Sequence, residues 1–135
     1  MKPVTPLLTV DAIIYHPMKG IVLIERGHDP FKGRWALPGG FVDVGETVED
    51  ACVREAKEET GLDVRIVKLM GVYSDPSRDP RGHTVSVVYI CEVVGGELIG
   101  GDDAVKAEWF ISLKDISLAF DHERIVRESG VIRSQ

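Results

Sequence analysis

The stretch that decides the fold covers residues 39–62 and reads GGFVDVGETVEDACVREAKEETGL. Its first third is rich in glycine and predicts a loop, and the remainder predicts one helix with marked ends. Thr47 is a good N-cap residue, and Asp50 three positions later resembles a capping box with Asp in place of the usual Glu or Gln. Gly61 stands where a residue in the left-handed conformation would end the helix.

One face of the predicted helix changes from apolar to acidic along its length. At about 100° per residue, this face carries Val48, Ala51, Cys52, Glu55, Glu58 and Glu59. Its apolar start indicates that the face points toward the protein, where carboxylates repel one another and are costly to desolvate unless a cation meets them. The i, i+3, i+4 spacing of the three glutamates lets their oxygens converge on one point.

A divalent cation that prefers oxygen ligands, Mg²⁺ or Mn²⁺, is the simplest partner for three converging carboxylates. Arg54 lies four residues before Glu58, so it can orient that carboxylate through a charge-assisted bond. The alternative is an ordinary solvated acidic face, and the spacing by itself does not choose between the two.

A longer pattern of fixed positions surrounds this helix. In order it is Gly40, five residues, Glu46, seven residues, Arg54-Glu55, an aliphatic residue, any residue, Glu58-Glu59, any residue, Gly61 and an aliphatic residue. This is the Nudix box with no fixed position missing, so the chain resembles the Nudix hydrolases. The one soft departure is Ala56, which is small where a bulkier aliphatic residue is common, and it affects packing rather than chemistry.

Length and composition predict one domain over residues 1–135, because 135 residues with 44% hydrophobic content can bury one core. The formal net charge of −6 argues against a general nucleic-acid binder or a membrane-surface protein. No apolar run is long enough to span a bilayer and the N-terminus lacks a signal-peptide pattern, so we expect a cytoplasmic protein. The sequence leaves both a monomer and a homodimer open.

The two cysteines, Cys52 and Cys91, lie far apart in the sequence and in apolar surroundings. This context favours buried free thiols in a reducing compartment over a disulfide or a redox pair.

The order of predicted elements favours an α/β fold with a mixed sheet and helices on both of its sides. Strands are expected at residues 7–15, 21–25, 35–37, 64–73, 84–94, 97–99 and 107–111, and a final helix at 121–128. Residues 95–96 are expected to form a hairpin turn before the strand at 97–99. The resemblance implies the α/β/α sandwich of the Nudix fold.

Two polar loops carry the candidate substrate-binding residues. The first gathers the cations Arg26, His28, Lys32 and Arg34 just before the acidic helix. In a negatively charged protein this predicts a rim for a phosphorylated ligand, with ordinary solvated cations as the alternative.

The second loop, residues 74–83, follows the strand after the box. Arg78 and Arg81 are suited to bidentate phosphate binding, and His83 completes the predicted substrate-binding set. The neighbouring Asp75 and Asp79 offer the alternative that these arginines form internal ion pairs.

Three single residues have two open interpretations each. Asp11, inside the first strand, is expected at a sheet edge rather than at a ligand. Trp35 is expected in the core rather than as a stacking platform, and His122 as a capping or packing residue rather than a catalyst.

The resemblance implies roles for the acidic residues. The Gly39 carbonyl, Glu55, Glu58 and Glu59 would bind the metal, and Arg54 would orient a carboxylate. An acidic residue of the late region often joins such a site, and the candidates here are Asp102, Asp103 and Glu108, each with a solvated turn as the alternative. The general base would be Glu55, Glu58 or Asp103, and the sequence does not choose among them.

The resemblance also implies the reaction, metal-dependent hydrolysis of a nucleoside diphosphate linked to another moiety. The proline-containing loop at 74–83 resembles that of the ADP-ribose pyrophosphatase branch, so we expect ADP-ribose to be cleaved to AMP and ribose 5-phosphate. One alternative is a pyrophosphohydrolase for nucleoside triphosphates such as oxidised dGTP. Another is a non-catalytic ADP-ribose-sensing domain, which the intact box disfavours.

Overall fold

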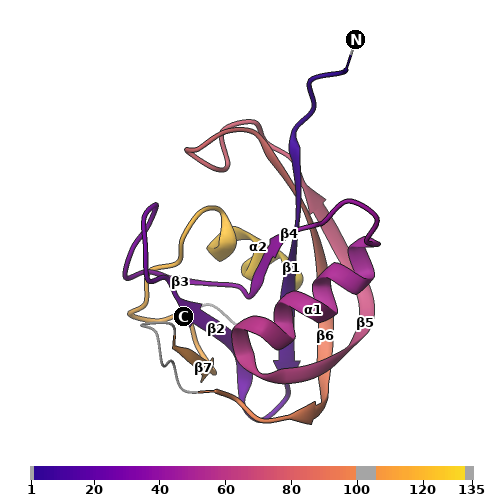
Figure 1. Ribbon diagram of the computed structural model, residues 1–135. Coiled ribbons are helices and arrows are strands. Elements are labelled where there is room, and N and C mark those ends of the chain that lie inside the picture. Colours follow the sequence, from indigo (N-terminus) through magenta and orange to yellow (C-terminus); the bar gives the residue numbers. More distant parts are fainter. Residues whose placement is uncertain (1, 100–105, 133–135) are drawn as a thin grey trace.

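The computed structural model of the chain describes residues 2–99 and 106–132. Its elements follow in the order β1 (Leu7–His16), β2 (Gly20–Glu25), β3 (Trp35–Ala36), β4 (Gly39–Phe41), α1 (Val48–Thr60), β5 (Leu62–Tyr73), β6 (Thr84–Gly96), β7 (Ala107–Phe110) and α2 (His122–Ser129) (Figure 1). The predicted mixed sheet with two helices is confirmed.

Strand β1 is the centre of the sheet, whose order is β3-β2-β1-β6-β5. It pairs in parallel with β6 and antiparallel with β2 and β4, while β7 adds to β2 and β5 to β6. The predicted hairpin of the first two strands is therefore confirmed. The pairing of β4 with β1 matters most for function, because it fixes the glycine-rich loop beside the acidic helix.

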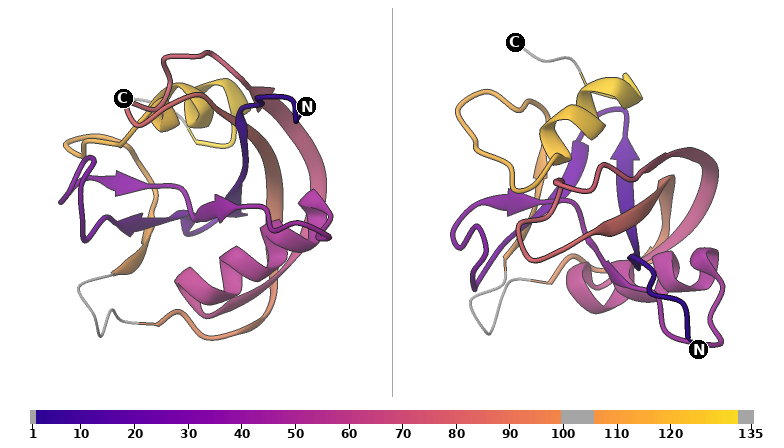
Figure 2. Two further views of the ribbon diagram at one scale, coloured as in Figure 1. Left: turned by 45° about the horizontal axis from the view of Figure 1, so that its top comes forward. Right: turned by 90° about the horizontal axis from the view of Figure 1, so that it is seen from above.

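The two helices cover opposite faces of the sheet (Figure 2). Side chains alternate between the faces of a strand, so neighbouring residues of β1 enter different cores. Val10 and Ala12 pack with Ala51 and Cys52 of α1, whereas Ile13 packs with Ile125 of α2. This alternation produces the α/β/α sandwich.

The ends of α1 are those that the sequence predicts. The Thr47 hydroxyl accepts a hydrogen bond of 3.0 Å from the Asp50 N–H. Gly61 has φ of 80°, and its N–H donates to the Lys57 carbonyl. A Cβ on Gly61 would lie 2.3 Å from the Glu97 carbonyl oxygen, so the tight packing of the next segment also requires glycine here.

The predicted hairpin turn at residues 95–96 and the strand at 97–99 are wrong. Gly95 and Gly96 end β6 and pair with Asp63 and Leu62 of β5. The following segment is held by α1 instead, because the Ile99 N–H donates to the Thr60 carbonyl at 2.9 Å.

Asp11 is not at a sheet edge. It lies on the central strand β1 and is 7% exposed. Trp35 packs edge-on against Phe110 with 4.8 Å between ring centroids, which agrees with a core role.

Cys52 and Cys91 are buried free thiols as predicted, although the fold brings their sulfur atoms to 3.8 Å. The neighbouring Cys91 thiol and burial raise the pKa of Cys52. None of the helices in residues 2–99 and 106–132 has the length and apolar character needed to cross a membrane.

Candidate active site

The glycine-rich loop lies tightly between α1 and β1. A Cβ on Gly40 would stand 2.3 Å from Glu55 Oε2, and a Cβ on Gly39 would stand 2.1 Å from the Val10 carbonyl oxygen. Both distances are far below van der Waals contact, so a side chain on Gly39 would collide with the β1 backbone and one on Gly40 would displace the Glu55 carboxylate. The close approach brings the loop backbone within hydrogen-bonding distance of a helix carboxylate, since the Gly39 N–H lies 2.7 Å from Glu59 Oε1.

Arg54 is the hub of the acidic cluster. Its Nε and Nη2 donate to the Glu46 carboxylate at 2.6 and 2.9 Å, and its Nη1 donates to Glu55 and to Glu58 at 3.2 Å each. Nη2 also donates to the Phe41 carbonyl of β4 at 3.1 Å. The bond from Arg54 lowers the pKa of Glu46 to about 2. The predicted Arg54–Glu58 contact is present, and one guanidinium fixes three carboxylates and the loop.

Glu59 faces the loop rather than Arg54. Its Oε1 accepts a hydrogen bond of 2.7 Å from the Gly39 N–H. Burial raises the pKa of Glu59 to about 8 despite that bond, and burial also raises the pKa of Glu55. The Glu58 side chain is more open, with 57% of its surface exposed.

The three glutamates do not converge on one point as the spacing suggested. Among the described residues, no three acidic, His or Cys side chains are close enough to enclose an ion. The reason is local hydrogen bonding, since Glu55 and Glu58 turn to Arg54 while Glu59 turns to the Gly39 N–H.

The donor set nevertheless fits a hard divalent cation. All candidate ligands are oxygens, and they lie along one side of α1 next to the glycine-rich loop. The raised pKa values of Glu55 and Glu59 show that burial disfavours their charged forms, a cost that a bound cation would offset. The assignment of the Gly39 carbonyl, Glu55, Glu58 and Glu59 as metal ligands stays a prediction.

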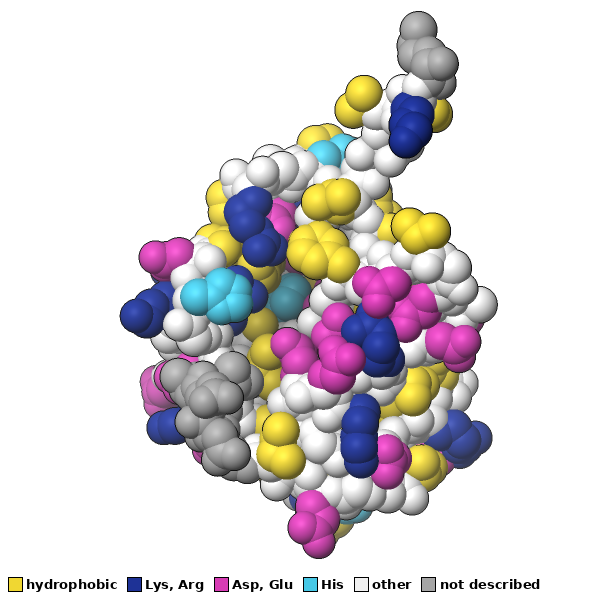
Figure 3. Space-filling view, viewed as in Figure 1, with side chains coloured by type: hydrophobic (Ala, Val, Ile, Leu, Met, Phe, Trp, Pro, Cys, Tyr) yellow, Lys and Arg dark blue, Asp and Glu magenta, His cyan; other side chains and the backbone are white. Residues whose placement is uncertain are grey.

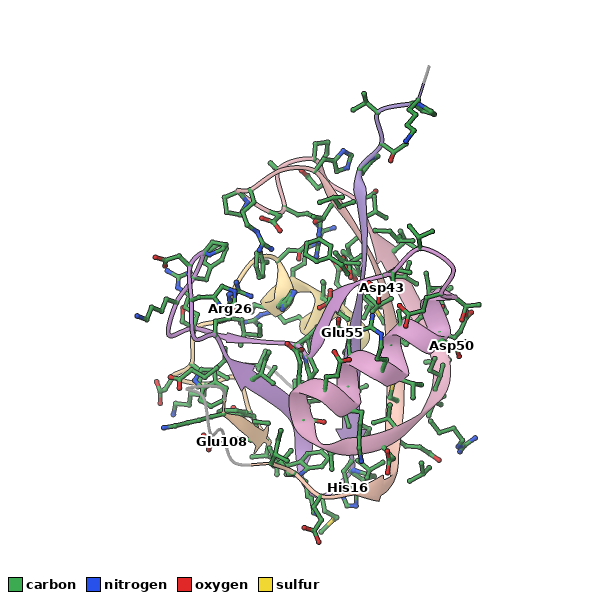
Figure 4. All side chains as sticks on the ribbon, viewed as in Figure 1. His16, Arg26, Asp43, Asp50, Glu55 and Glu108 are labelled. Atoms are coloured by element: carbon green, nitrogen blue, oxygen red, sulfur yellow. The ribbon has the colours of Figure 1, made fainter. Side chains whose placement is uncertain are left out.

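The late acidic candidates are not brought to this cluster. Asp102 and Asp103 lie outside the described residues. Glu108 lies on β7, where it pairs with Leu23 and is exposed. Figure 4 shows Glu108 well apart from Glu55.

A cavity of about 90 Å³, open to solvent, adjoins the loop. Its lining includes Gly39, Glu59, Arg26, Arg81 and Phe120. In Figure 3 a groove runs between the acidic side chains over α1 and basic side chains on the opposite rim. The cavity thus places the buried glutamate of the box and two cations around one space.

Arg26 and Arg81 share the ring of Phe120, with guanidinium carbons 4.9 and 5.7 Å from its centroid. Arg26 Nε donates to the Pro30 carbonyl at 2.6 Å, whereas its buried Nη2 has no hydrogen-bond partner within the part of the chain that the structure describes. Burial and the charge of Arg81 lower the pKa of Arg26. Two cations on one ring beside a cavity favour binding of an anion there.

Arg78 is engaged elsewhere. Its Nε and Nη2 donate to both oxygens of Asp121 at 3.0 and 2.8 Å, and its Nη1 donates to the Thr84 hydroxyl at 2.7 Å. Only 5% of its side chain is exposed. An internal ion pair was the predicted alternative, but the partner is Asp121 rather than Asp75 or Asp79. Phosphate binding by Arg78 remains a prediction, although its guanidinium already donates hydrogen bonds to Asp121 and Thr84.

Arg81 forms the ion pair that the sequence offered as its alternative. Its Nη2 and Nε donate to Asp79 at 2.8 and 3.1 Å. Its side chain is still 48% exposed, so it can reach a ligand in the cavity. Asp75 instead accepts bonds from the N–H and hydroxyl of Ser77.

Arg34 and His83 lie away from the center of the cavity. Arg34 is exposed and lies 5.3 Å from the ring of Phe31. His83 bonds through Nε2 to the Ser74 carbonyl at 2.9 Å and lines a neighbouring groove beside Leu7. Their predicted substrate contacts stay predictions.

Asp11 and His122, which the sequence analysis did not bring together, meet in a buried polar cluster that lines the cavity. His122 Nδ1 accepts a hydrogen bond of 3.0 Å from the Leu37 N–H, and its Nε2 lies 3.6 Å from Asp11 Oδ1. The Ser86 hydroxyl donates to the other oxygen of Asp11. Burial raises the pKa of Asp11 and lowers that of His122. The one available signal was an acidic residue inside an otherwise apolar strand.

Comparison with known proteins adds independent evidence. A model of the NUDIX domain matches residues 5–129. The ADP-ribose pyrophosphatase of Methanocaldococcus jannaschii is 57% identical over 123 residues, which cover 91% of this chain and 72% of that protein.

Two solved structures resemble the chain along most of its length. The NUDIX domain of Shewanella oneidensis NrtR complexed with ADP ribose has a TM-score of 0.80 and 31% identity, covering 93% of this chain and 87% of that one. A bifunctional NMN adenylyltransferase/ADP ribose pyrophosphatase of Francisella tularensis, complexed with AMP and a Mn ion, has a TM-score of 0.77 and 30% identity. The match covers 91% of this chain and 40% of the Francisella protein.

Proposed function

Because this chain belongs to the Nudix family of hydrolases, we propose that it hydrolyses ADP-ribose to AMP and ribose 5-phosphate with Mg²⁺, for which Mn²⁺ can substitute. The observation that carries the proposal is the shared cavity, in which Glu59 and Gly39 of the box face the same space as Arg26 and Arg81. The identity with the Methanocaldococcus ADP-ribose pyrophosphatase supports the choice of substrate. The match over residues 5–129 supports one Nudix domain.

The acidic side of the site would hold the divalent cation through the Gly39 carbonyl, Glu55, Glu58 and Glu59. A bound divalent cation neutralises diphosphate charge and lowers the pKa of water. Arg54 keeps Glu55 and Glu58 in place through its hydrogen bonds. One carboxylate, from Glu55, Glu58 or Asp103, would accept the proton of the attacking water.

The bonds made and broken follow from the substrate. The water oxygen bonds to a phosphorus of the diphosphate, and the bond from that phosphorus to the bridging oxygen breaks. The bridging oxygen leaves with the other phosphate, so one water and one ADP-ribose give AMP and ribose 5-phosphate.

The basic side of the cavity would bind the diphosphate. Arg81 is half exposed beside it, and the buried Nη2 of Arg26 would gain an acceptor if a phosphate oxygen reached it. Charge-assisted bonds from guanidinium groups to phosphate are strong and directional. The arrangement suits a diphosphate flanked on both sides by larger groups.

A substrate panel tests the proposal directly. AMP or phosphate release is measured for ADP-ribose, dinucleotides, dNTPs and oxidised dGTP with Mg²⁺, with Mn²⁺ and with excess EDTA. We expect the highest kcat/KM for ADP-ribose, no turnover in EDTA, and recovery when the cation is returned. Full turnover in EDTA would contradict the metal chemistry.

Two other outcomes would identify the alternatives. A preference for any triphosphate of about tenfold or more, roughly 1.4 kcal/mol in transition-state binding, would assign the chain to triphosphate hydrolysis. Tight ADP-ribose binding in calorimetry without turnover at any cation concentration would support the sensing function instead.

A further inference from the structure

We infer that His122 is a positioning residue that fixes residues 37–40, the segment that carries the proposed metal-binding carbonyl, from the opposite face of the sheet. The inference rests on the proposed metal site, and it assigns a function to the C-terminal helix α2.

The backbone of this segment is bonded to three different elements. The Leu37 N–H donates to His122 of α2 at 3.0 Å, the Pro38 carbonyl accepts from the Ala12 N–H of β1 at 2.8 Å, and the Gly39 N–H donates to Glu59 of α1 at 2.7 Å. Strand β1 is next to the segment because it pairs with β4, and helix α1 is next to it because it follows β4 in the sequence. The histidine bond ties the backbone of the segment to α2, on the other side of the sheet, where the Leu37 side chain also packs in one core with Ile125 and Val126.

The ring of His122 is held in one orientation. Since Nδ1 accepts from the Leu37 N–H, the proton of the neutral imidazole is on Nε2, which lies 3.6 Å from Asp11 Oδ1. The Ser86 hydroxyl in turn donates to Asp11. His122 and Asp11 are 4% and 7% exposed, so these contacts are largely shielded from solvent. The arrangement resembles the outer-shell hydrogen bonds that orient metal ligands in general.

The start of α2 is itself fixed by Arg78. Its bidentate bond to Asp121 and its bond to Thr84 hold the residue just before His122. The loop at 74–83 is thereby connected to the proposed metal-binding loop through Asp121 and His122, consecutive residues at the start of α2. This connection explains why Arg78 is buried, a position that phosphate binding alone would not require.

Two substitutions separate the hydrogen bond to Leu37 from the packing of the ring. In His122→Asn the amide oxygen can occupy the position of Nδ1 and accept from the Leu37 N–H. In His122→Gln the amide nitrogen can occupy the position of Nε2 and face Asp11, which leaves the buried Leu37 N–H without an acceptor. Both replacements are polar and smaller than or similar to imidazole, so each serves as the control for the other.

The test is Mn²⁺ binding by the intact chain without substrate, measured by calorimetry or electron paramagnetic resonance, together with hydrogen exchange of the Leu37 amide by NMR. We expect the Mn²⁺ affinity of His122→Asn to stay within about threefold of that of the parent chain. We expect His122→Gln to weaken Mn²⁺ binding by about tenfold or more and to speed exchange of the Leu37 amide by a similar factor.

Equal Mn²⁺ affinity of the two variants would overturn the inference, whether both match the parent or both fall. A parent chain that binds no Mn²⁺ would instead defeat the proposed metal site and the inference with it. If His122→Gln does not fold, the Asp121→Asn variant is tested in its place. This substitution weakens the bonds from Arg78 that hold the start of α2, and it retains the His122 imidazole. We then expect weaker Mn²⁺ binding in the same direction, and an unchanged affinity would overturn the inference.

Discussion

Helix α1 and the loop at residues 74–83 both place arginines beside carboxylates, but they do so in opposite ways. Arg54 of α1 binds Glu55 and Glu58, which are its neighbours in the sequence. Arg78 of the loop binds Asp121, which lies 43 residues away. A helix fixes which residues are neighbours, whereas Arg78 finds its partner only when the chain has folded.

The loop shows a second contrast within itself. Arg78 and Arg81 are three residues apart and have the same chemistry, yet their side chains are 5% and 48% exposed. The first anchors α2 and the second borders the cavity. Sequence reasoning treats them as equivalent phosphate binders, and their different burial predicts different consequences of mutation.

The largest expected effect separates these two arginines by stability. Arg78→Ala leaves the Asp121 carboxylate and the Thr84 hydroxyl without their partner, so we expect the free energy of unfolding to fall by about 3–5 kcal/mol. Arg81→Ala removes an ion pair whose arginine is half exposed and whose Asp79 is buried, but Asp79 keeps the bond donated by the backbone N–H of residue 81, so the cost should be smaller, about 1–2 kcal/mol. Urea unfolding of both variants measures this difference, and equal losses would show that the two arginines are equivalent after all.

The second prediction tests the acidic face of α1 by activity. Glu59→Gln keeps the shape of the side chain and removes the charge of a proposed metal ligand, so kcat should fall by ~10²-fold or more while the fold survives. Glu49 is exposed on the same helix and accepts a bond from the Tyr89 hydroxyl, so Glu49→Gln is the matched control and should change kcat little. Steady-state kinetics measures kcat for both variants. Similar losses of kcat would show that the face of α1 that carries Glu59 is not the functional one.

A third prediction concerns Arg81 as a substrate contact. Arg81→Ala should raise KM for ADP-ribose and lower kcat/KM by about 1–3 kcal/mol, because a charge-assisted bond to phosphate is lost. Arg34→Ala is the control, since the Arg34 side chain is exposed and, within the described ranges, forms no side-chain hydrogen bond to a residue that lines the cavity. A larger loss for Arg34→Ala would mean that the diphosphate lies along the other loop.

The smallest effect is the pH dependence of the Arg81–Asp79 pair. Burial alone would raise the pKa of Asp79, but the bonds donated by the Arg81 side chain and N–H outweigh it, and the pKa lies below its usual value. A lowered pKa in the folded state means that the pair stabilises the fold above the pKa of an unfolded aspartate, about 3.9. This stability is then lost as the pH falls through the lower folded value.

The measurement compares the parent with Asp79→Asn in urea unfolding between pH 7 and pH 2.5. We expect a difference of about 1 kcal/mol or less that is constant from pH 7 to about pH 5 and disappears toward the acid end. A difference that grows on acidification would give the opposite sign and refute the assignment.

Much of the fold and part of the site could be predicted from local patterns. Thr47 and Gly61 end α1 as their types require, because a cap and a left-handed residue act on the adjacent backbone. The Arg54–Glu58 contact follows from helical spacing in the same way. The convergence of Glu55, Glu58 and Glu59 did not follow, since spacing places side chains on one face without choosing their hydrogen-bond partners.

The sequence by itself determined the box, the helix that carries it, the mixed sheet and the oxygen-rich donor set, because these depend on periodicity and on residue chemistry over short distances. The tertiary structure alone decided which arginine is buried, that Cys52 meets Cys91, and that His122 bonds to the Leu37 N–H. The physical reason is that these contacts join residues distant in the chain. A buried polar group takes whichever partner the packed sheet and helices bring within hydrogen-bonding distance.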